Sequence, residues 1–158
     1  MKSFKLSGIR VLELQQVVDS LQPKEFSSLK EIRMAANVAK DLGEAIKELS
    51  DAFFDFNKKQ FELLKTYQER FKNESEGLDN NAKNELLKQI DKDFKEQIEQ
   101  RYPDEQKKVD ELGKGEIEVE LGDEKFDFLK TTFSKHAKDK YLNKEVLLIV
   151  ADALGVEE

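Results

Sequence analysis

The feature that most constrains the fold is an apolar rhythm of threes and fours, which runs without proline from about Phe26 to about Phe71. Its members are Leu29, Ile32, Ala36, Ala39, Leu42, Ile46, Leu49, Phe53, Phe56, Leu63, Tyr67 and Phe71. One position of the repeat is occupied by a polar residue, Gln60. This spacing predicts one long α-helix. At ~1.5 Å per residue the helix would be roughly 70 Å long. A compact domain of 158 residues cannot cover that length, so part of the helix is expected to protrude or to meet a partner.

The period of this rhythm is near 3.5 residues, which favours a left-handed coiled-coil contact with a second helix. The first half of the stretch carries small residues along its seam, namely Ala35, Ala36, Ala39, Gly43 and Ala45. Small side chains let another helix approach closely. The second half is aromatic, and its adjacent Phe53 and Phe54 cannot both face one seam. Phe54 and Phe61 therefore widen the apolar surface, and we expect a third helix or a second subunit to cover them.

A turn is expected at residues 73–81, where Gly, Asn and Ser cluster and the rhythm stops. Asn80 or Asn81 can cap the helix that follows. That helix carries a stripe of Leu86 or Leu87, then Ile90, Phe94, Ile98 and Tyr102. We expect it to fold back antiparallel on the long helix. Pro103 then kinks or restarts it, and the helical pattern continues to about Gly113.

Two segments outside this hairpin have the alternation of strands. In Lys2–Ser7 the apolar Phe4 and Leu6 share one face, and a helix is expected to begin near Gly8. Glu116–Leu121 alternates without exception, which predicts a strand with one wet face. The N-terminal strand is one candidate partner for it, because an isolated strand would leave its backbone groups unpaired.

The segment Lys125–Phe128 leaves two alternatives open, a short second strand or the start of a helix. We favour a helix from about Asp127 to about Lys138, with or without a short strand before it. A last helix is expected from about Lys144 to about Leu154, and Gly155 is a good C-terminal stop.

These elements predict a mainly α fold with a minor β element. The expected architecture is a long antiparallel helical hairpin, similar to a coiled coil, joined to a small sheet and short helices. We expect one domain over residues 1–158, with the hairpin arm at about 24–112 and a base formed by 1–22 and 113–158. Charged residues make up 39% of the chain, which fits elongated helices with a large solvated surface.

Side chains suited to catalysis or metal binding are scarce. The chain has no cysteine and a single histidine, His136. A di-iron four-helix site is excluded, because it needs a histidine three residues after a glutamate on each of two helices. The carboxylate pair Asp51 and Asp55 is typical of an exposed helix face. We therefore predict that the chain is not an enzyme and has no catalytic residue, no cofactor and no metal site.

Charge and hydropathy narrow the choice of partners. The net charge is −7 with both signs interspersed, and no basic stripe is present that could displace counterions from a duplex. Direct nucleic-acid binding is therefore not expected. The longest apolar run, Val146–Ala151, is too short to span a bilayer, and no signal-peptide pattern occurs. We expect no membrane contact and a cytoplasmic location.

These exclusions leave contact with another protein. We predict a non-catalytic interaction or assembly protein that binds a protein partner or itself, as a homo-oligomer or as part of a larger assembly. The predicted interaction surface comprises Phe53, Phe54, Phe56, Phe61, Leu64, Tyr67, Phe71, Ile90, Phe94 and Ile98. An exposed apolar surface of this size is typical of protein-binding sites.

The order of parts is a short N-terminal strand, a helical hairpin, one alternating strand and a terminal helix pair. In this order, and in its Lys/Glu/Asn/Phe-rich composition, the chain resembles small uncharacterised proteins of tailed bacteriophages of low-GC bacteria. The resemblance implies a virion component, an assembly factor or an inhibitor of a host protein, located in the host cytoplasm or the virion. One alternative is an acidic regulator that mimics DNA through the edge Glu116–Glu124. A second alternative is a hydrolase with a carboxylate metal site.

Overall fold

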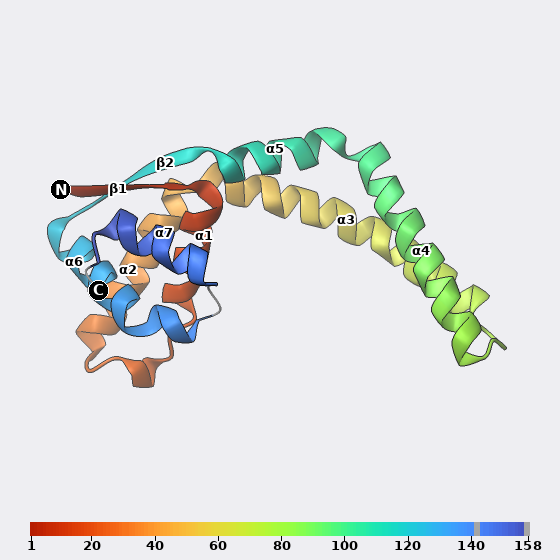
Figure 1. Ribbon diagram of the computed structural model, residues 1–158, viewed down its shortest axis with the longest axis horizontal. Helices are drawn as coiled ribbons and strands as arrows, with labels where there is room; N and C mark the ends of the chain where they lie inside the picture. Colours follow the sequence, from red (N-terminus) through yellow and green to blue (C-terminus); the bar gives the residue numbers. More distant parts are fainter. Residues whose placement is uncertain (141–142, 157–158) are drawn as a thin grey trace. The chain divides into compact units, whose positions relative to one another are not determined.

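The computed structural model describes residues 1–140 and 143–156 and shows a mainly α protein with a minor β element (Figure 1). This confirms the predicted fold class. In chain order the elements are β1 (Lys2–Ser7), α1 (Gly8–Asp19), the 3₁₀ turn η1 (Pro23–Glu25), α2 (Leu29–Ala45), α3 (Lys47–Glu74), α4 (Asn80–Arg101), α5 (Pro103–Lys114), β2 (Glu116–Leu121), α6 (Asp123–His136), the 3₁₀ turn η2 (Ala137–Asp139) and α7 (Lys144–Leu154).

The chain divides into two compact units. The base unit comprises Met1–Ser50 and Leu112–Glu158, and the hairpin unit comprises Asp51–Glu111. The division differs from the expected start of the arm near residue 24. Helix α2 packs on α1 and therefore belongs to the base unit.

The base unit contains a two-stranded antiparallel sheet, as its two strand predictions require. β1 pairs with β2 so that Phe4 lies opposite Val119 and Leu6 lies opposite Ile117. Phe4, Leu6, Val119 and Leu121 are buried, while the three glutamates of β2 lie exposed on the other face. Helices α1, α6 and α7 contact β1 and supply the apolar cover of the sheet. The predicted wet face of β2 is therefore confirmed.

The helices of the base unit pack closely where the sequence has small residues. Gln15 on α1 donates a side-chain hydrogen bond to the carbonyl oxygen of Ala39 on α2, at 3.1 Å. A Cβ atom on Gly43 would lie 2.6 Å from the same Gln15 amide nitrogen. Ala35 and Ala39 on α2 are buried as well. The prediction that the Ala/Gly half permits close helix approach is thus confirmed.

The prediction of one uninterrupted helix from Phe26 to Phe71 is wrong. The helix begins at Leu29, whose side chain is 73% exposed, and it is broken at Ile46. Ile46 has φ −112° and ψ 23°, outside the helical range, and its side chain is fully buried in the base unit. A single non-helical residue leaves the apolar rhythm almost in phase, so periodicity does not register the break. Packing of Ile46 and Leu49 prevails over helical continuity.

The boundaries of two later helices also differ from expectation. Helix α6 begins at Asp123, so Lys125–Phe128 is helical and the alternative of a second strand is wrong. Asp123 and Glu124 favour this earlier start, because negative side chains stabilise the positive end of the helix dipole. Helix α4 is capped by Asp79, which accepts from the Ala82 amide at 2.8 Å, and neither Asn80 nor Asn81 has that role. The predicted α7 is confirmed at both ends.

Candidate interaction surface on the helical hairpin

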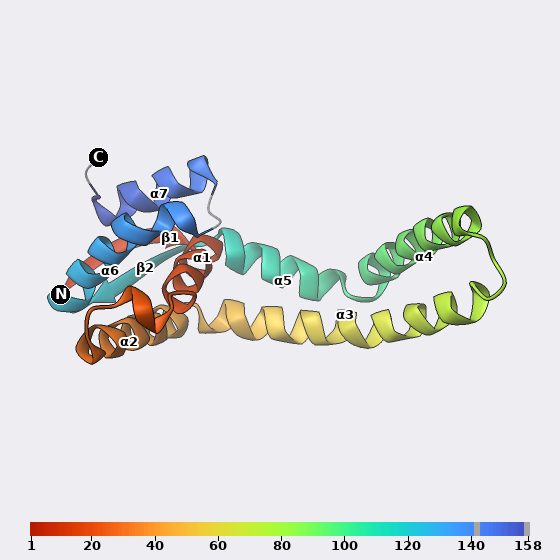
Figure 2. The same ribbon diagram turned by 90° about the horizontal axis from the view of Figure 1, so that it is seen from below.

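The hairpin unit is built from α3, from Asp51 onward, and the returning helices α4 and α5 up to Glu111 (Figure 2). Gly77, at φ +78°, supplies the left-handed residue of the turn. Tyr67 on α3 and Phe94 on α4 contact edge to face, with ring centroids 5.7 Å apart. The predicted antiparallel return of the second helix is therefore confirmed.

Two groups of ion pairs connect α3 to the returning helices, one near the turn and one near the opposite end of the hairpin. Near the turn, Arg70 donates to Asp93 at 2.8 Å. Nearer the other end, the Lys59 ammonium lies 3.2 Å from Asp55 on α3 and 3.4 Å from Glu105 on α5. These contacts set the register of the helices and leave the apolar surfaces between and beside them.

The ion pair near the turn also shifts the ionisation of its members. The hydrogen bond from Arg70 lowers the pKa of the Asp93 carboxyl, with a smaller effect from the Gln89 amide. The hydrogen bond to Asp93 raises the pKa of the Arg70 guanidinium in turn. Both groups are therefore charged across the physiological pH range, and the ion pair links α3 to α4.

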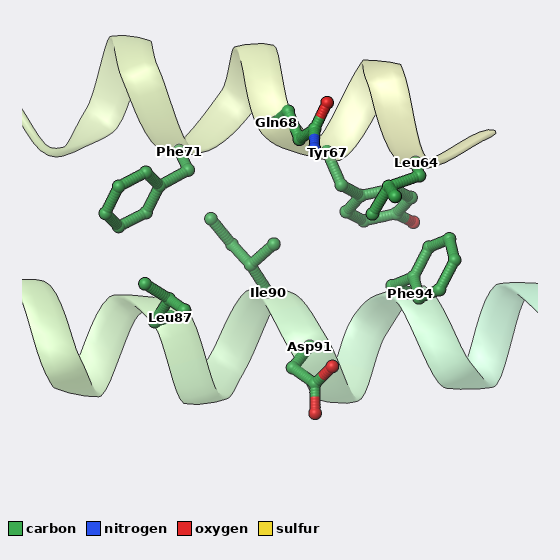
Figure 3. Close-up of a pocket in the computed structure, with 8 residues that line it drawn as sticks. All are labelled: Leu64, Tyr67, Gln68, Phe71, Leu87, Ile90, Asp91 and Phe94. Carbon is green, nitrogen blue, oxygen red and sulfur yellow. The ribbon is translucent and has the colours of Figure 1, made fainter. Parts of the chain in front are cut away.

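An open apolar groove of about 230 Å³ lies between α3 and α4 (Figure 3). It is lined by Leu64, Tyr67, Gln68 and Phe71 from α3 and by Leu87, Ile90, Asp91 and Phe94 from α4. Ile90 points toward α3 between Phe71 and Tyr67, whereas Asp91 points away from it (Figure 3). Leu87 is 51% exposed at the groove. The two helices thus leave apolar side chains that neither of them covers fully.

A second apolar surface lies beside the groove on α3. We call it the outer seam and define it as Phe54, Asn57, Phe61, Leu64, Gln68 and Phe71. Phe54 is 73% exposed and Phe61 is 55% exposed. At about 100° per residue, these six positions share one face of the helix. Leu64, Gln68 and Phe71 also line the groove, so the two surfaces are continuous.

The six positions of the outer seam are uncharged residues, and the ammonium of the neighbouring Lys65 lies over the Phe61 ring, 4.8 Å from its centroid. Between Ser50 and Phe71 every Asp, Glu, Lys and Arg of the helix falls on the remaining part of its circumference. The chain as a whole is 39% charged, so a face of six uncharged positions over about five helical turns is a strong local departure. Charge depletion with aromatic enrichment is the composition of interface cores.

The predicted interaction residues fall into three groups. Phe56, Ile90 and Ile98 are buried within the hairpin unit, whereas Phe54 and Phe61 are exposed. The remaining members, which are half-buried, are Phe53, Leu64, Tyr67, Phe71 and Phe94. The groove brings together five of the ten, namely Leu64, Tyr67, Phe71, Ile90 and Phe94. Burial of the first group assigns it to the packing of the hairpin itself.

Sequence reasoning missed three polar residues and one leucine of this surface. Asn57 and Gln68 occupy the outer seam, and Asp91 and Leu87 line the groove. A pattern of apolar residues alone does not include Asn57 and Gln68. A pattern of uncharged residues would include them, because they continue the regular spacing of Phe54, Phe61 and Leu64.

The acidic edge Glu116–Glu124 is matched by cations only in part among the described residues. The N-terminal amine lies 3.3 Å from Asp123, and just beyond the edge Lys125 lies 2.7 Å from Asp41. On the wet face of the sheet, Glu118 lies opposite Lys5. The acidic regulator therefore stays a prediction that these contacts do not strengthen.

Metal-binding clusters and membrane-spanning helices are both absent from the described residues. Within residues 1–140 and 143–156, no group of three or more His, Asp or Glu side chains is arranged to hold a metal ion. The carboxylate-metal hydrolase therefore stays a prediction that no such group supports. None of the described helices combines the length and the apolar character that crossing a membrane requires.

Comparisons with protein-family models, with curated proteins and with solved structures each found no match to this chain.

Proposed function

We propose that this chain is a non-catalytic protein–protein interaction or assembly protein, and that the outer seam and the groove of its hairpin hold a second polypeptide. The observation that carries this proposal is the exposure of Phe54 and Phe61 on a seam of six positions that holds no charged residue. In a virion or in its assembly, the setting that the resemblance to phage proteins implies, such a hairpin would join one subunit to another.

Energetics support a contact role for the two phenylalanines. Moving a fully exposed Phe side chain out of water contributes about 1.5–3 kcal/mol. Interfaces derive most of their affinity from a few such anchors near the centre of the contact. Phe54 and Phe61 stand two turns apart on α3, and Leu87 adds a third exposed apolar side chain at the groove.

The chemistry of the surface also indicates the class of partner. Nucleic acid is bound through lysines and arginines that contact phosphates. The outer seam has none, and its polar members are the amides of Asn57 and Gln68. Such a surface fits an apolar or amide-bearing face of another protein helix, with hydrogen bonds between amides fixing the position.

The proposal is tested by site-specific photo-crosslinking in the native cell. A photoreactive phenylalanine analogue replaces Phe61, and in a control protein it replaces Glu99, which is exposed on α4. We expect a discrete protein adduct from position 61 and none from position 99. Mass spectrometry of the adduct then identifies the partner. Equal labelling from both positions, or no adduct from position 61, would contradict the proposal.

A further inference from the structure

The outer seam has the spacing of a coiled-coil seam. Its residues follow one another at intervals of three, four, three, four and three, which is the alternation of the a and d positions of a heptad. Tyr67, which contacts Phe94 on α4, lies beside this seam, and the seam itself borders the groove at Leu64, Gln68 and Phe71. Its two phenylalanines nearest the base end of the helix, Phe54 and Phe61, are the large side chains left exposed. A regular seam left open is a site for one further helix.

We infer that this further helix is the same segment of a second copy of the chain, running antiparallel, with a two-fold axis between residues 62 and 63. The inference rests on the proposed function and names its partner. In chain order the seam consists of Phe, Asn, Phe, Leu, Gln and Phe, and the alternation of apolar and amide residues is the same from either end.

The antiparallel register pairs like with like in every layer. Phe54 lies level with Phe71 of the second copy, and Phe61 lies level with Leu64 of the second copy. Between them, Asn57 lies level with Gln68 of the second copy. The amides can therefore bond to each other, which avoids the cost of burying them against apolar side chains. A buried amide layer of this kind fixes the register of paired helices.

The position of the groove distinguishes this arrangement from a parallel one. The groove flanks the outer seam on the side of α3 that faces α4. A two-fold axis perpendicular to the helices places both grooves on the same side of the contact, so that Leu87 of each copy is covered by the other hairpin. An axis along the helices would instead place each groove beside the flank that carries Lys58 and Lys65.

Charges on that lysine flank are close to balanced in the antiparallel arrangement. Asp51 lies near Lys72 of the second copy at each end of the contact. Lys58 lies near Lys65 of the second copy, and Glu62 stands beside both on the same helix. Because these side chains are exposed, their net effect is small. The apolar and amide layers therefore determine the pairing.

The natural absence of cysteine makes a disulfide test direct. Asn57→Cys and Gln68→Cys are prepared as two separate proteins, because both positions are exposed and neither change removes a packed side chain. In the antiparallel register, position 57 of one copy meets position 68 of the other. Two copies of position 57 are then about 16 Å apart along the axis, at ~1.5 Å per residue, which is too far for a disulfide.

The expected result is a covalent dimer when the two proteins are mixed under mild oxidation, and little or none from either protein alone. Asp55→Cys with Thr66→Cys is the matched control, since these exposed positions have the same separation on the opposite side of α3. That mixture should remain uncrosslinked. Circular dichroism of each variant shows that its helices are intact.

Three outcomes overturn the inference, and they have different consequences for the proposed function. Crosslinking of each single variant with itself would show a parallel pair, which keeps the outer seam as an interface. No seam-specific dimer in the mixture, together with a photo-adduct of another protein at position 61, would assign the surface to a different partner. If the mixture gives no seam-specific dimer and position 61 gives no photo-adduct, both the inference and the proposed function are contradicted.

Discussion

Arg70 on α3 donates from Nη1 to Oδ2 of Asp93 on α4 across 2.8 Å, and this bond spans the two helices of the hairpin beside the edge-to-face contact of Tyr67 and Phe94. The same guanidinium donates from Nε to Glu74 at 2.9 Å. One side chain thus links the end of α3 to the returning helix.

The Arg70–Asp93 pair predicts a pH-dependent stability of the hairpin. The folded state lowers the pKa of Asp93 through the Arg70 hydrogen bond, so the folded chain binds this proton less readily than the unfolded chain. The stabilisation is therefore present above the unfolded pKa of about 3.9 and is lost as the pH falls through the lower folded value. Thermal unfolding should show Asp93→Asn less stable than wild type at pH 7, with the difference vanishing in strong acid.

Glu85→Gln serves as the control for this prediction, since Glu85 and its partner Lys88 are both exposed on α4. We expect it to change stability little at any pH. A deficit of Asp93→Asn that persists unchanged in acid would show that the carboxylate charge is not what the pair contributes.

Gly8 predicts a steric effect in the base unit. A Cβ atom at this position would lie 2.5 Å from the carbonyl oxygen of Leu112, a backbone atom that cannot swing away. Gly8→Ala should therefore lower the free energy of unfolding by about 1–3 kcal/mol, the usual cost of overpacking. At Gly113 the nearest such atom is Ile9 Cβ at 3.8 Å, so Gly113→Ala should be neutral or slightly stabilising. Urea unfolding of both variants measures the contrast, and equal effects would refute the close contact.

The cap of α4 predicts which residue of the turn matters. Asp79 accepts a hydrogen bond from the Ala82 amide at 2.8 Å, while Asn81 is exposed within the first turn. Asp79→Ala should cost about 1 kcal/mol, and Asn81→Ala should cost far less. Thermal melts followed by helical circular dichroism compare the two. A larger loss from Asn81→Ala would place the cap at another residue.

Core packing predicts a contrast between two leucines. Leu129 on α6 is fully buried, whereas Leu148 on α7 is exposed. Leu129→Ala should lower the free energy of unfolding by about 2–5 kcal/mol. Leu148→Ala should change it by no more than about 0.5 kcal/mol. Chemical denaturation of the two variants provides the measurement, and similar losses would contradict the assignment of the core.

Local patterns were sufficient to predict much of this fold. The alternation in Glu116–Leu121 and in Lys2–Ser7 specifies strands, and the spacing in α4 specifies the returning helix. The break at Ile46 was not predicted, because the apolar spacing continues across it, while the structure shows a non-helical backbone and a buried side chain at that residue. The early start of α6 was missed because the alternating Phe126 and Phe128 also suit a strand.

The candidate surface was predicted in part, because local patterns identify its apolar members and not its polar ones. Phe54 and Phe61 stand out because they fall outside the main apolar rhythm, and both are exposed. Asn57 and Gln68 complete the outer seam but are polar, so an apolar pattern cannot include them. Burial of Phe56 and Ile98 depends on the return of α4 and α5, which only the three-dimensional structure shows.

Sedimentation equilibrium tests the central claim, that this chain meets a second copy through the outer seam of α3. Phe61→Glu places a charge in an apolar layer of the seam, and Thr66→Glu places the same charge at an exposed position on the opposite side of the helix. We predict twice the chain mass for wild type and Thr66→Glu, and the mass of a single chain for Phe61→Glu. A wild-type mass of one chain at every concentration, or equal masses for wild type and Phe61→Glu, would contradict the claim.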